Sequence, residues 1–222
     1  MYYIGDSLTV GQGSTSGHVY PDVVQLELGP RYESIRLGFP GRRATWFVDT
    51  KLDSVAAVLE NSKKKVVLLW FGANDIANIG AVPKYPTVEA YEHTTRGLAK
   101  SLRIGNTKVV IVSVLNRKDS VPNQHMDADR LAANKYFQQH WSEFADGYVD
   151  LAKEHQLFAS NAPDNSALFT DKVHLLDRGY KQVGLRWVGG QRLLGRFLSR
   201  TEPLGIDIQG AGGGQHGATF AD

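Results

Sequence analysis

Hydrophobic residues recur along the chain in two patterns, which predict alternating strands and helices. Residues 65–71 are almost wholly apolar, as expected of a central parallel strand buried on both faces. Four shorter apolar runs predict further strands, and apolar residues at helical spacing predict helices between them. The predicted strands are residues 2–4, 32–37, 65–71, 108–115 and 147–151, and the predicted helices are residues 20–28, 47–59, 88–102, 128–144 and 177–198. This order predicts an α/β fold, a three-layer α/β/α sandwich around a five-stranded parallel sheet.

Length and composition are those of one globular domain. The chain has 222 residues, of which 42% are hydrophobic and 22% charged. We expect one folded domain over residues 1–200, followed by a glycine-rich tail or linker over residues 201–222 that is mobile. The sequence contains no cysteine, which excludes a disulfide framework, a thiolate zinc site and a cysteine nucleophile.

Charge and hydropathy narrow the classes of partner. The net charge of +2 is too small to favour nucleic acid or an anionic membrane as the main partner. No apolar run approaches the roughly 20 residues that a membrane-spanning helix needs. The N-terminus shows no signal peptide pattern, so we expect a cytoplasmic protein or a part of a larger extracellular or viral assembly. Oligomeric state is left open.

Candidate chemical groups follow the predicted strands. Ser7 comes after the first strand, Gly41 after the second, Asn74 after the third, and Asp171 and His174 after the fifth. Because parallel strands end at the same edge of a sheet, these residues can converge. Acyl transfer needs a nucleophile, a base, an orienting acid and donors to a developing oxyanion. The five residues provide that set.

Each of these residues also has a structural interpretation. Ser7 and Asp171 could cap helices, and Asn74 could cap the segment after its strand. Gly41 could serve a turn, and His174 could be a surface histidine. The joint occurrence of all five on this topology favours the catalytic interpretation.

Four short motifs give the chain a family resemblance. They are Gly-Asp-Ser-Leu at residues 5–8 with Gly11, Gly-Phe-Pro-Gly at 38–41, Gly-Ala-Asn-Asp at 72–75, and Asp-Lys-Val-His-Leu at 171–175. The chain resembles the SGNH hydrolases, also called the GDSL esterase and lipase family, from residue 2 to about residue 198. The resemblance implies a flavodoxin-like topology and a serine hydrolase that needs no cofactor and no metal.

The resemblance also implies a role for each site residue. It makes Ser7 the nucleophile and His174 the base, with Asp171 orienting the base. The oxyanion hole would consist of the backbone N–H groups of Ser7 and Gly41 and the side-chain amide of Asn74. On this basis we expect a carboxylesterase with a Ser-His-Asp triad and an acyl-enzyme intermediate.

The second motif departs from the family pattern. Arg36 stands where an Asn often precedes the first glycine, and Arg42 and Arg43 stand where a small or hydroxyl residue is more usual. Only the backbone of Gly41 is needed for the oxyanion role, so we expect that role to hold.

The absence of a long insertion predicts a shallow, open cleft, which suits short acyl groups. We therefore expect hydrolysis of O-acetyl groups on a carbohydrate, the substrate being a small molecule or a polysaccharide ester. Phe39, Arg42, Trp46 and the loop 116–126 are candidate walls, although the two aromatic residues could equally belong to the core. The alternatives are a lipase-, lysophospholipase- or thioesterase-like acyl hydrolase and a non-catalytic carbohydrate-binding relative.

Other classes fit the sequence less well. An α/β-hydrolase needs a Gly-x-Ser-x-Gly elbow in mid-chain, which is absent here. A flavin- or phosphate-binding domain would not need Asn74 or the Asp171–His174 pair. A metal-dependent hydrolase needs clustered His and Asp ligands, and the sequence shows no such spacing. The small-residue loop 11–17 lacks a P-loop pattern, and we interpret it as a flexible rim of the active site.

Overall fold

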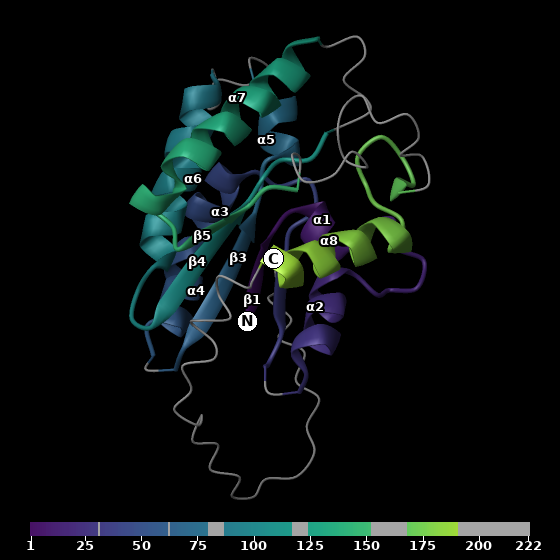
Figure 1. The fold of residues 1–222 in the computed structure, drawn as a ribbon. Coiled ribbons are helices and arrows are strands. Elements are labelled where there is room, and N and C mark those ends of the chain that lie inside the picture. The colour runs from purple at the N-terminus through teal and green to yellow at the C-terminus, as the bar shows by residue number, and fades with distance from the viewer. Residues whose placement is uncertain (31, 62, 80–86, 117–123, 152–167, 191–222) are drawn as a thin grey trace, which may run out of the picture.

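The fold is an α/β sandwich built on one parallel sheet (Figure 1). The computed structural model describes residues 1–30, 32–61, 63–79, 87–116, 124–151 and 168–190. Five strands pair in the order β2-β1-β3-β4-β5, and every pair is parallel. The strands are β1 (Tyr2–Gly5), β2 (Ile35–Gly38), β3 (Lys65–Trp70), β4 (Thr107–Val112) and β5 (Gly147–Val149). The predicted fold class is confirmed, with each strand where its apolar run indicated.

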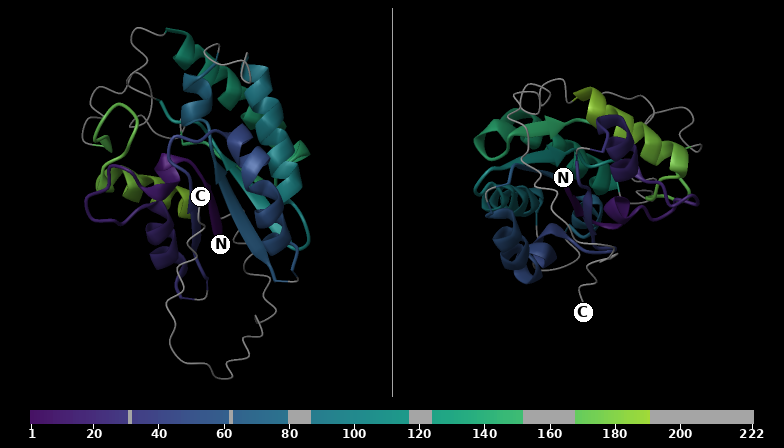
Figure 2. Two further views of the ribbon diagram at one scale, coloured as in Figure 1. Left: turned by 180° about the vertical axis from the view of Figure 1, so that it is seen from behind. Right: turned by 90° about the horizontal axis from the view of Figure 1, so that it is seen from below.

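Helices cover both faces of the sheet, as the two further views show (Figure 2). Helices α1, α2 and α8 lie on one face, and α3, α4, α6 and α7 lie on the other. The described helices are α1 (Ser7–Val10), α2 (Tyr20–Leu28), α3 (Ala44–Thr50), α4 (Leu52–Leu59), α5 (Ala73–Ala77), α6 (Val88–Leu102), α7 (Gln124–His140), the 3₁₀ turn Trp141–Glu143, and α8 (Asp177–Gly190). None of the helices described is long and apolar enough to cross a bilayer.

The alternation of side chains along β3 divides the core in two. Val67 and Leu69 pack under α3, α4, α6 and α7, whereas Leu68 and Trp70 pack under α2 and α8. The ring of Trp70 meets that of Tyr20 edge to face, at 5.2 Å between centroids. Burying such side chains contributes about 1.5–3 kcal/mol each. A strand buried on both faces is what the continuous apolar run predicted.

The predicted helix 47–59 is wrong in its continuity. The structure has two helices that meet at Lys51, where the backbone leaves the helical region (φ −125°, ψ −20°). The hydroxyl of Thr50 donates to the carbonyl of Trp46, four residues earlier, at 2.7 Å. Such back-bonding competes with the helical ladder and bends helices. The apolar periodicity carries no signal of this break.

Other boundaries shift by a few residues. Helix α7 begins and ends four residues before the predicted 128–144, and the 3₁₀ turn occupies the remainder. Helix α8 begins at Asp177 as predicted and is described to Gly190. The predicted end of that helix and the predicted mobile tail lie outside the described residues.

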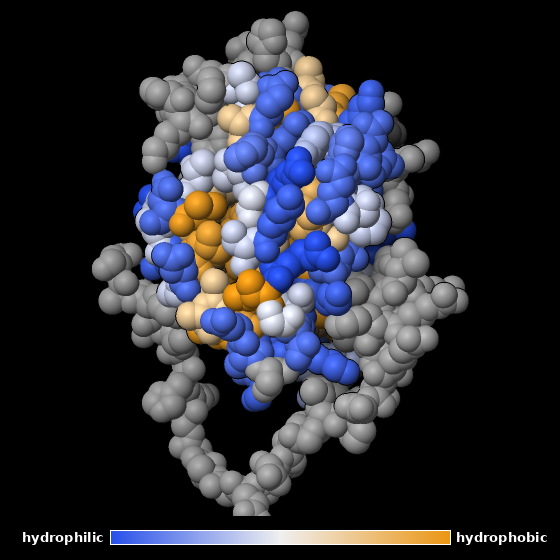
Figure 3. Space-filling model, turned by 90° about the vertical axis from the view of Figure 1, so that its left-hand side faces the viewer, coloured by the Kyte–Doolittle hydropathy of each residue, from blue (hydrophilic) through white to orange (hydrophobic). Residues whose placement is uncertain are grey.

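A groove of about 300 Å³ runs between α3, α4 and α6. It lies on the face that includes these helices, which is mostly hydrophilic with a few hydrophobic side chains open to solvent (Figure 3). Its walls are Thr45, Val48, Asp49, Leu52, His93, Thr94, Gly97, Leu98 and Ser101. None of the predicted catalytic residues lines it.

Candidate active site

The carboxyl ends of β1, β2 and β3 meet at one edge of the sheet. Gly5 ends β1 and pairs with Gly38 on one side and Trp70 on the other. A side chain at Gly5 would collide with the Trp70 carbonyl and the Thr9 hydroxyl. Glycine therefore lets the first strand turn at once into α1, and that turn places Ser7 over the sheet edge.

Ser7 is the first residue of α1, and its hydroxyl is directed to a histidine. Its predicted alternative role as a helix cap is wrong, because the cap is Asp6, whose carboxylate accepts the Leu8 N–H at 3.0 Å. The Ser7 Oγ lies 2.9 Å from His174 Nε2. Only 3% of Ser7 is exposed to solvent, so little of its surface is open to water.

His174 connects Ser7 to Asp171. The Nδ1 of His174 lies 2.7 Å from Asp171 Oδ2. The imidazole is 15% exposed, whereas the Asp171 side chain is 51% exposed. The structure thus brings together three residues that the sequence placed at opposite ends of the chain, in the order hydroxyl, imidazole, carboxylate.

Asp171 closes a local turn and is also the partner of the imidazole; its alternative role as a helix cap is wrong, because the next helix begins only at Asp177. Its Oδ1 accepts the backbone N–H groups of Val173 and His174, each at 2.6 Å. Partial burial works against ionisation of Asp171, but the hydrogen bonds from the His174 side chain and from these two N–H groups outweigh it, so the pKa of Asp171 is lowered. The carboxylate therefore stays charged beside the ring, which favours an imidazole with its proton on Nδ1.

Gly41 lies in the turn after β2, and Asn74 lies in the first turn of α5, after β3. Gly41 has a left-handed backbone (φ +71°) in a turn closed by the Arg42 N–H and the Phe39 carbonyl at 3.1 Å. The Asn74 side chain donates to the Arg42 carbonyl at 3.0 Å. An amide nitrogen carries two hydrogens, so this bond fixes Asn74 beside the Gly41 turn while leaving a second N–H for another acceptor.

Asp75 also organises this side of the site, although the sequence indicated for it, together with Asn74, only a possible cap of the segment after the strand. Its carboxylate is fully buried and accepts the Ala44 N–H at 2.9 Å. This contact joins α5, which carries Asn74, to the first residue of α3. A charged residue directly after a buried strand was the available signal, since buried carboxylates need donors.

The candidate cleft walls flank Gly41. The Phe39 and Trp46 rings are 5.1 Å apart, and the Arg42 guanidinium lies 4.8 Å from the centre of Trp46. Both rings are partly exposed and also pack against the core. The contact with the core is therefore confirmed, and their role as walls of a cleft stays a prediction. Of the loop 116–126, residues 117–123 lie outside the described part.

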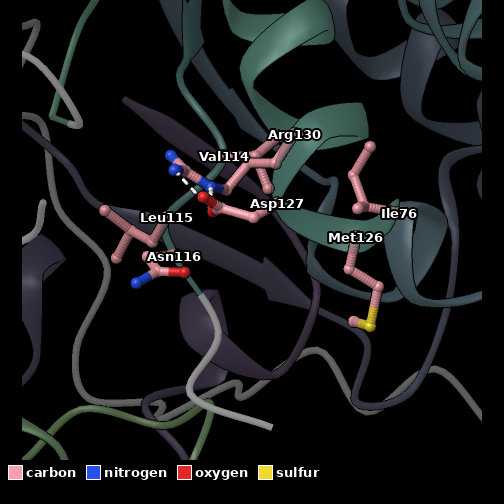
Figure 4. Close-up of a pocket in the computed structure, with 7 residues that line it drawn as sticks. All are labelled: Ile76, Val114, Leu115, Asn116, Met126, Asp127 and Arg130. Atoms are coloured by element: carbon pink, nitrogen blue, oxygen red, sulfur yellow. Dashed lines mark hydrogen bonds and ion pairs between the residues drawn. The ribbon is translucent and has the colours of Figure 1, made fainter. Parts of the chain in front are cut away.

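A small cavity lies between α5, α7 and the end of β4 (Figure 4). It is lined by Ile76, Val114, Leu115, Asn116, Met126, Asp127 and Arg130. Arg130 is only 4% exposed at its side chain and pairs with Asp127 at 2.8 Å. The volume, about 10 Å³, suits one water molecule and is too small for an acyl group.

No group of three His, Asp or Glu side chains suited to a metal ion occurs in the described part of the chain. At the carboxyl edge of the sheet, a serine, a histidine and an aspartate form one chain of hydrogen bonds. Gly41 and Asn74, which follow the two neighbouring strands, carry N–H groups. Such an arrangement can support nucleophilic attack on a carbonyl and stabilise the negative oxygen that results.

The model of the GDSL-like lipase/acylhydrolase family matches residues 3–182. Among curated proteins, no sequence matches the chain. Several solved structures do match it. An acetyl xylan esterase, AlAXEase, aligns with a TM-score of 0.65 at 22% identity, covering 85% of this chain and 97% of that one.

Two further structures have the same fold at lower identity. A member of the lipolytic protein G-D-S-L family from Veillonella parvula DSM 2008 aligns with a TM-score of 0.65 at 16% identity, covering 85% of this chain and 95% of that one. A mutant of Axe2, an acetyl-xylooligosaccharide esterase from Geobacillus Stearmophilus, aligns with a TM-score of 0.62 at 19% identity, covering 85% of this chain and 92% of that one. At these identities the likeness concerns the fold.

Proposed function

The chain belongs to the GDSL-like lipase/acylhydrolase family, and we propose that it is a serine esterase that removes short acyl groups, chiefly O-acetyl groups from a carbohydrate. One observation carries the proposal. The Ser7 hydroxyl, the His174 imidazole and the Asp171 carboxylate form a continuous chain of hydrogen bonds at 2.9 and 2.7 Å. A serine hydroxyl is a weak nucleophile until an adjacent base takes its proton.

The proposed reaction has two halves. The Ser7 Oγ attacks the ester carbonyl carbon while its proton passes to His174 Nε2. The resulting imidazolium is stabilised by Asp171, and it then gives the proton to the departing alcohol oxygen as the C–O bond breaks. A water molecule next attacks the acyl-enzyme, again losing a proton to His174, and the acid leaves as Ser7 recovers its proton.

The negative oxygen of each tetrahedral intermediate needs donors. We assign this role to the backbone N–H groups of Ser7 and Gly41 and to the Asn74 amide. The bond from the Asn74 amide to the Arg42 carbonyl supports the assignment, because it fixes the Asn74 side chain against the segment that carries Gly41 before substrate arrives. Donors fixed in advance cost no reorganisation at the moment of reaction.

Two lines of support favour acetyl groups on a sugar. Two of the solved structures with this fold are described as an acetyl xylan esterase and an acetyl-xylooligosaccharide esterase. In this chain the partly exposed Phe39 and Trp46 rings lie beside the Gly41 turn, where they offer flat apolar surface to a sugar ring.

Labelling by a fluorophosphonate tests the nucleophile. We expect stoichiometric modification of Ser7 in the wild type, found by mass spectrometry of the peptide, and none in Ser7→Ala. Ser54→Ala, at an exposed serine of α4, is the matched control and should label like wild type. Labelling at another serine, or none, would contradict the proposed mechanism.

A panel of esters tests the substrate. We expect p-nitrophenyl acetate to be cleaved fast, with kcat/KM falling steeply toward the octanoate, and acetylated xylooligosaccharides to release acetate. A profile that rises with chain length would favour the lipase-like alternative. Binding of the sugars without turnover or labelling would favour a non-catalytic carbohydrate-binding protein.

A further inference from the structure

We propose that Asp177 is a positioning residue: it ties the loop that follows the nucleophile helix to the segment that carries His174, and so sets the approach of Ser7 to the imidazole. The inference rests on the proposed function, because it concerns the geometry of the same triad. It adds a residue that neither the four motifs nor the oxyanion and triad roles include.

One carboxylate gathers three consecutive loop residues. The Ser14 hydroxyl donates to Asp177 Oδ1 and the Thr15 hydroxyl to Oδ2, the latter at 2.8 Å. The backbone N–H of Thr15 donates to Oδ1 at 3.1 Å, and that of Ser16 to Oδ2 at 3.2 Å. These bonds join parts of the chain 161–163 positions apart. The loop predicted to be a flexible rim is therefore held along three residues.

The loop continues directly from the nucleophile. The backbone N–H groups of Gly11 and Gln12 both donate to the Ser7 carbonyl at 3.0 Å. The Gln12 carbonyl in turn accepts the Tyr180 hydroxyl of α8 at 2.8 Å. The backbone of Ser7 is therefore connected to residues 13–16 by a short path, which runs through the two hydrogen bonds from Gly11 and Gln12.

The same loop lies against the base. Gly13 has a left-handed backbone (φ +96°), and a Cβ there would lie 3.1 Å from the His174 Cβ and 2.7 Å from the Leu175 carbonyl oxygen. The loop backbone thus packs closely against the residue that bears the imidazole. Only glycine allows this approach, because both the conformation and the space exclude a side chain.

The segment that carries the base is itself fixed. The Thr170 N–H donates to the His174 carbonyl at 2.9 Å, and the Leu176 N–H donates to the Leu168 carbonyl at 2.8 Å. Asp177 follows as the first residue of α8, three positions after His174. The Asp177 carboxylate therefore connects the segment that carries His174 to the loop that follows Ser7.

The charge of Asp177 fits this role. Hydrogen bonds from Ser14 and Thr15, in that order of effect, and then from Ser16, lower the pKa of Asp177 well below the ordinary aspartate range. An ionised carboxylate accepts on both oxygens, as four donors on three residues require. An acidic residue in the first turn of a helix usually only stabilises that helix, and this ordinary role is what the experiment must separate.

The test compares two acids at helix starts. Asp177→Ala removes the contact, and Glu89→Ala is the matched control. Glu89 lies in the first turn of α6 on the other face of the sheet and is hydrogen-bonded to Thr87. We expect Asp177→Ala to lower kcat for p-nitrophenyl acetate about 10- to 100-fold, the scale of a misplaced reacting group. KM and the melting temperature should change little, and Glu89→Ala should behave like wild type.

A second variant keeps the experiment decisive if Asp177→Ala does not fold. Ser14→Ala/Thr15→Val leaves the acid in α8 and removes only the hydroxyl donors. We expect it to slow fluorophosphonate labelling of Ser7 and to lower kcat. Combined with Asp177→Ala it should add no further loss, because both changes break one interaction. Asp177→Asn, which retains one acceptor oxygen, should recover part of the rate.

The outcomes separate this inference from the proposed function. If wild type is active and Ser7→Ala is not, yet both loop variants keep wild-type kcat and labelling rates, the positioning role is wrong and the esterase proposal stands. Losses that are additive, or that match the fraction of unfolded protein, also overturn it. A wild type without turnover or labelling overturns both.

Discussion

The two sides of the candidate site are held in place by different physical means. On the side of α1 and α8, hydrogen bonds near the surface join distant segments, and the Asp171 side chain is 51% exposed. On the side of α3 and α5, the organising carboxylate of Asp75 is fully buried. The first side belongs to one face of the sheet and the second to the other (Figures 1 and 2).

This difference separates geometry from stability. Exposed hydrogen bonds and ion pairs contribute little to the free energy of unfolding because water competes for both partners, yet they can fix atoms within the distances that chemistry needs. A buried carboxylate that loses its contact, or a buried N–H that loses its acceptor, costs more. We therefore expect changes beside Ser7 to lower turnover with only a small loss of stability, and changes beside Asp75 to lower stability clearly as well.

The largest effect should come from Asp171→Asn. The amide retains an oxygen for the Val173 and His174 N–H groups, but it no longer favours the imidazole form with its proton on Nδ1. A triad altered in this way loses about 10⁴-fold in kcat. Initial rates with p-nitrophenyl acetate and thermal melting should show an inactive protein of nearly unchanged stability.

Asp53→Asn is the control for that variant, since Asp53 is exposed in the first turn of α4. It should keep wild-type rates. Turnover by Asp171→Asn within tenfold of wild type would remove Asp171 from the triad.

Asn74→Ala should have the next largest effect. It removes one proposed oxyanion donor, which typically costs about 10²–10³ in kcat, or roughly 3–4 kcal/mol of transition-state stabilisation. KM should change little, because the oxyanion forms only on the way to the intermediate. Asn61→Ala, on an exposed residue before β3, provides the comparison, and equal rates for the two variants would sink the oxyanion role.

Asp75→Ala should lower stability rather than chemistry alone. The Ala44 N–H would lose its buried acceptor, at a cost of about 1–3 kcal/mol in the free energy of unfolding. Urea unfolding measures this directly. Thr87→Ala, which removes an exposed helix cap from Ala90, should cost less. A stability loss at Thr87 equal to that at Asp75 would contradict the contrast between the two sides.

The smallest effect concerns the pH dependence of stability at Asp177. Because its pKa is lower in the folded than in the unfolded protein, its contribution is present above about pH 4 and is lost as the pH falls further. The gap in melting temperature between wild type and Asp177→Asn should therefore be full at neutral pH and shrink in acid. A gap in melting temperature that widened in acid would contradict a lowered pKa of Asp177 in the folded protein.

Much of this architecture could be predicted because the signals are local. Helices α2 and α6 occupy the predicted residues, and α2 ends at Gly29 with φ +79°, where a glycine indicated its end. The five strands follow from apolar runs and their order. The break at Lys51 was missed because the apolar spacing continues across it; the Thr50 hydroxyl that bonds the Trp46 carbonyl there is not part of the hydrophobic pattern.

The site was predictable where a motif and a strand end coincide. Ser7 and Asn74 follow that rule, whereas His174 lies well after the end of β5 and was indicated by its motif alone. The topology brings all three to one edge. Asp75 and Asp177 were not recognised, because their partners at Ala44 and at residues 14–16 are distant in sequence. The sequence indicates that a buried aspartate needs hydrogen-bond donors, but only the fold shows which residues provide them.

The distance along the chain between the two halves of the triad has a consequence for how activity arises. Ser7 and His174 are 167 positions apart, and all the strands lie between them or before them. Contacts of such long range form late, since the chain must first close the intervening loop. Recovery of ester hydrolysis should therefore follow the slowest phase of refolding. A newly synthesised chain should likewise stay inactive until α8 has packed against the sheet. The reaction would then serve as a kinetic marker of completed folding.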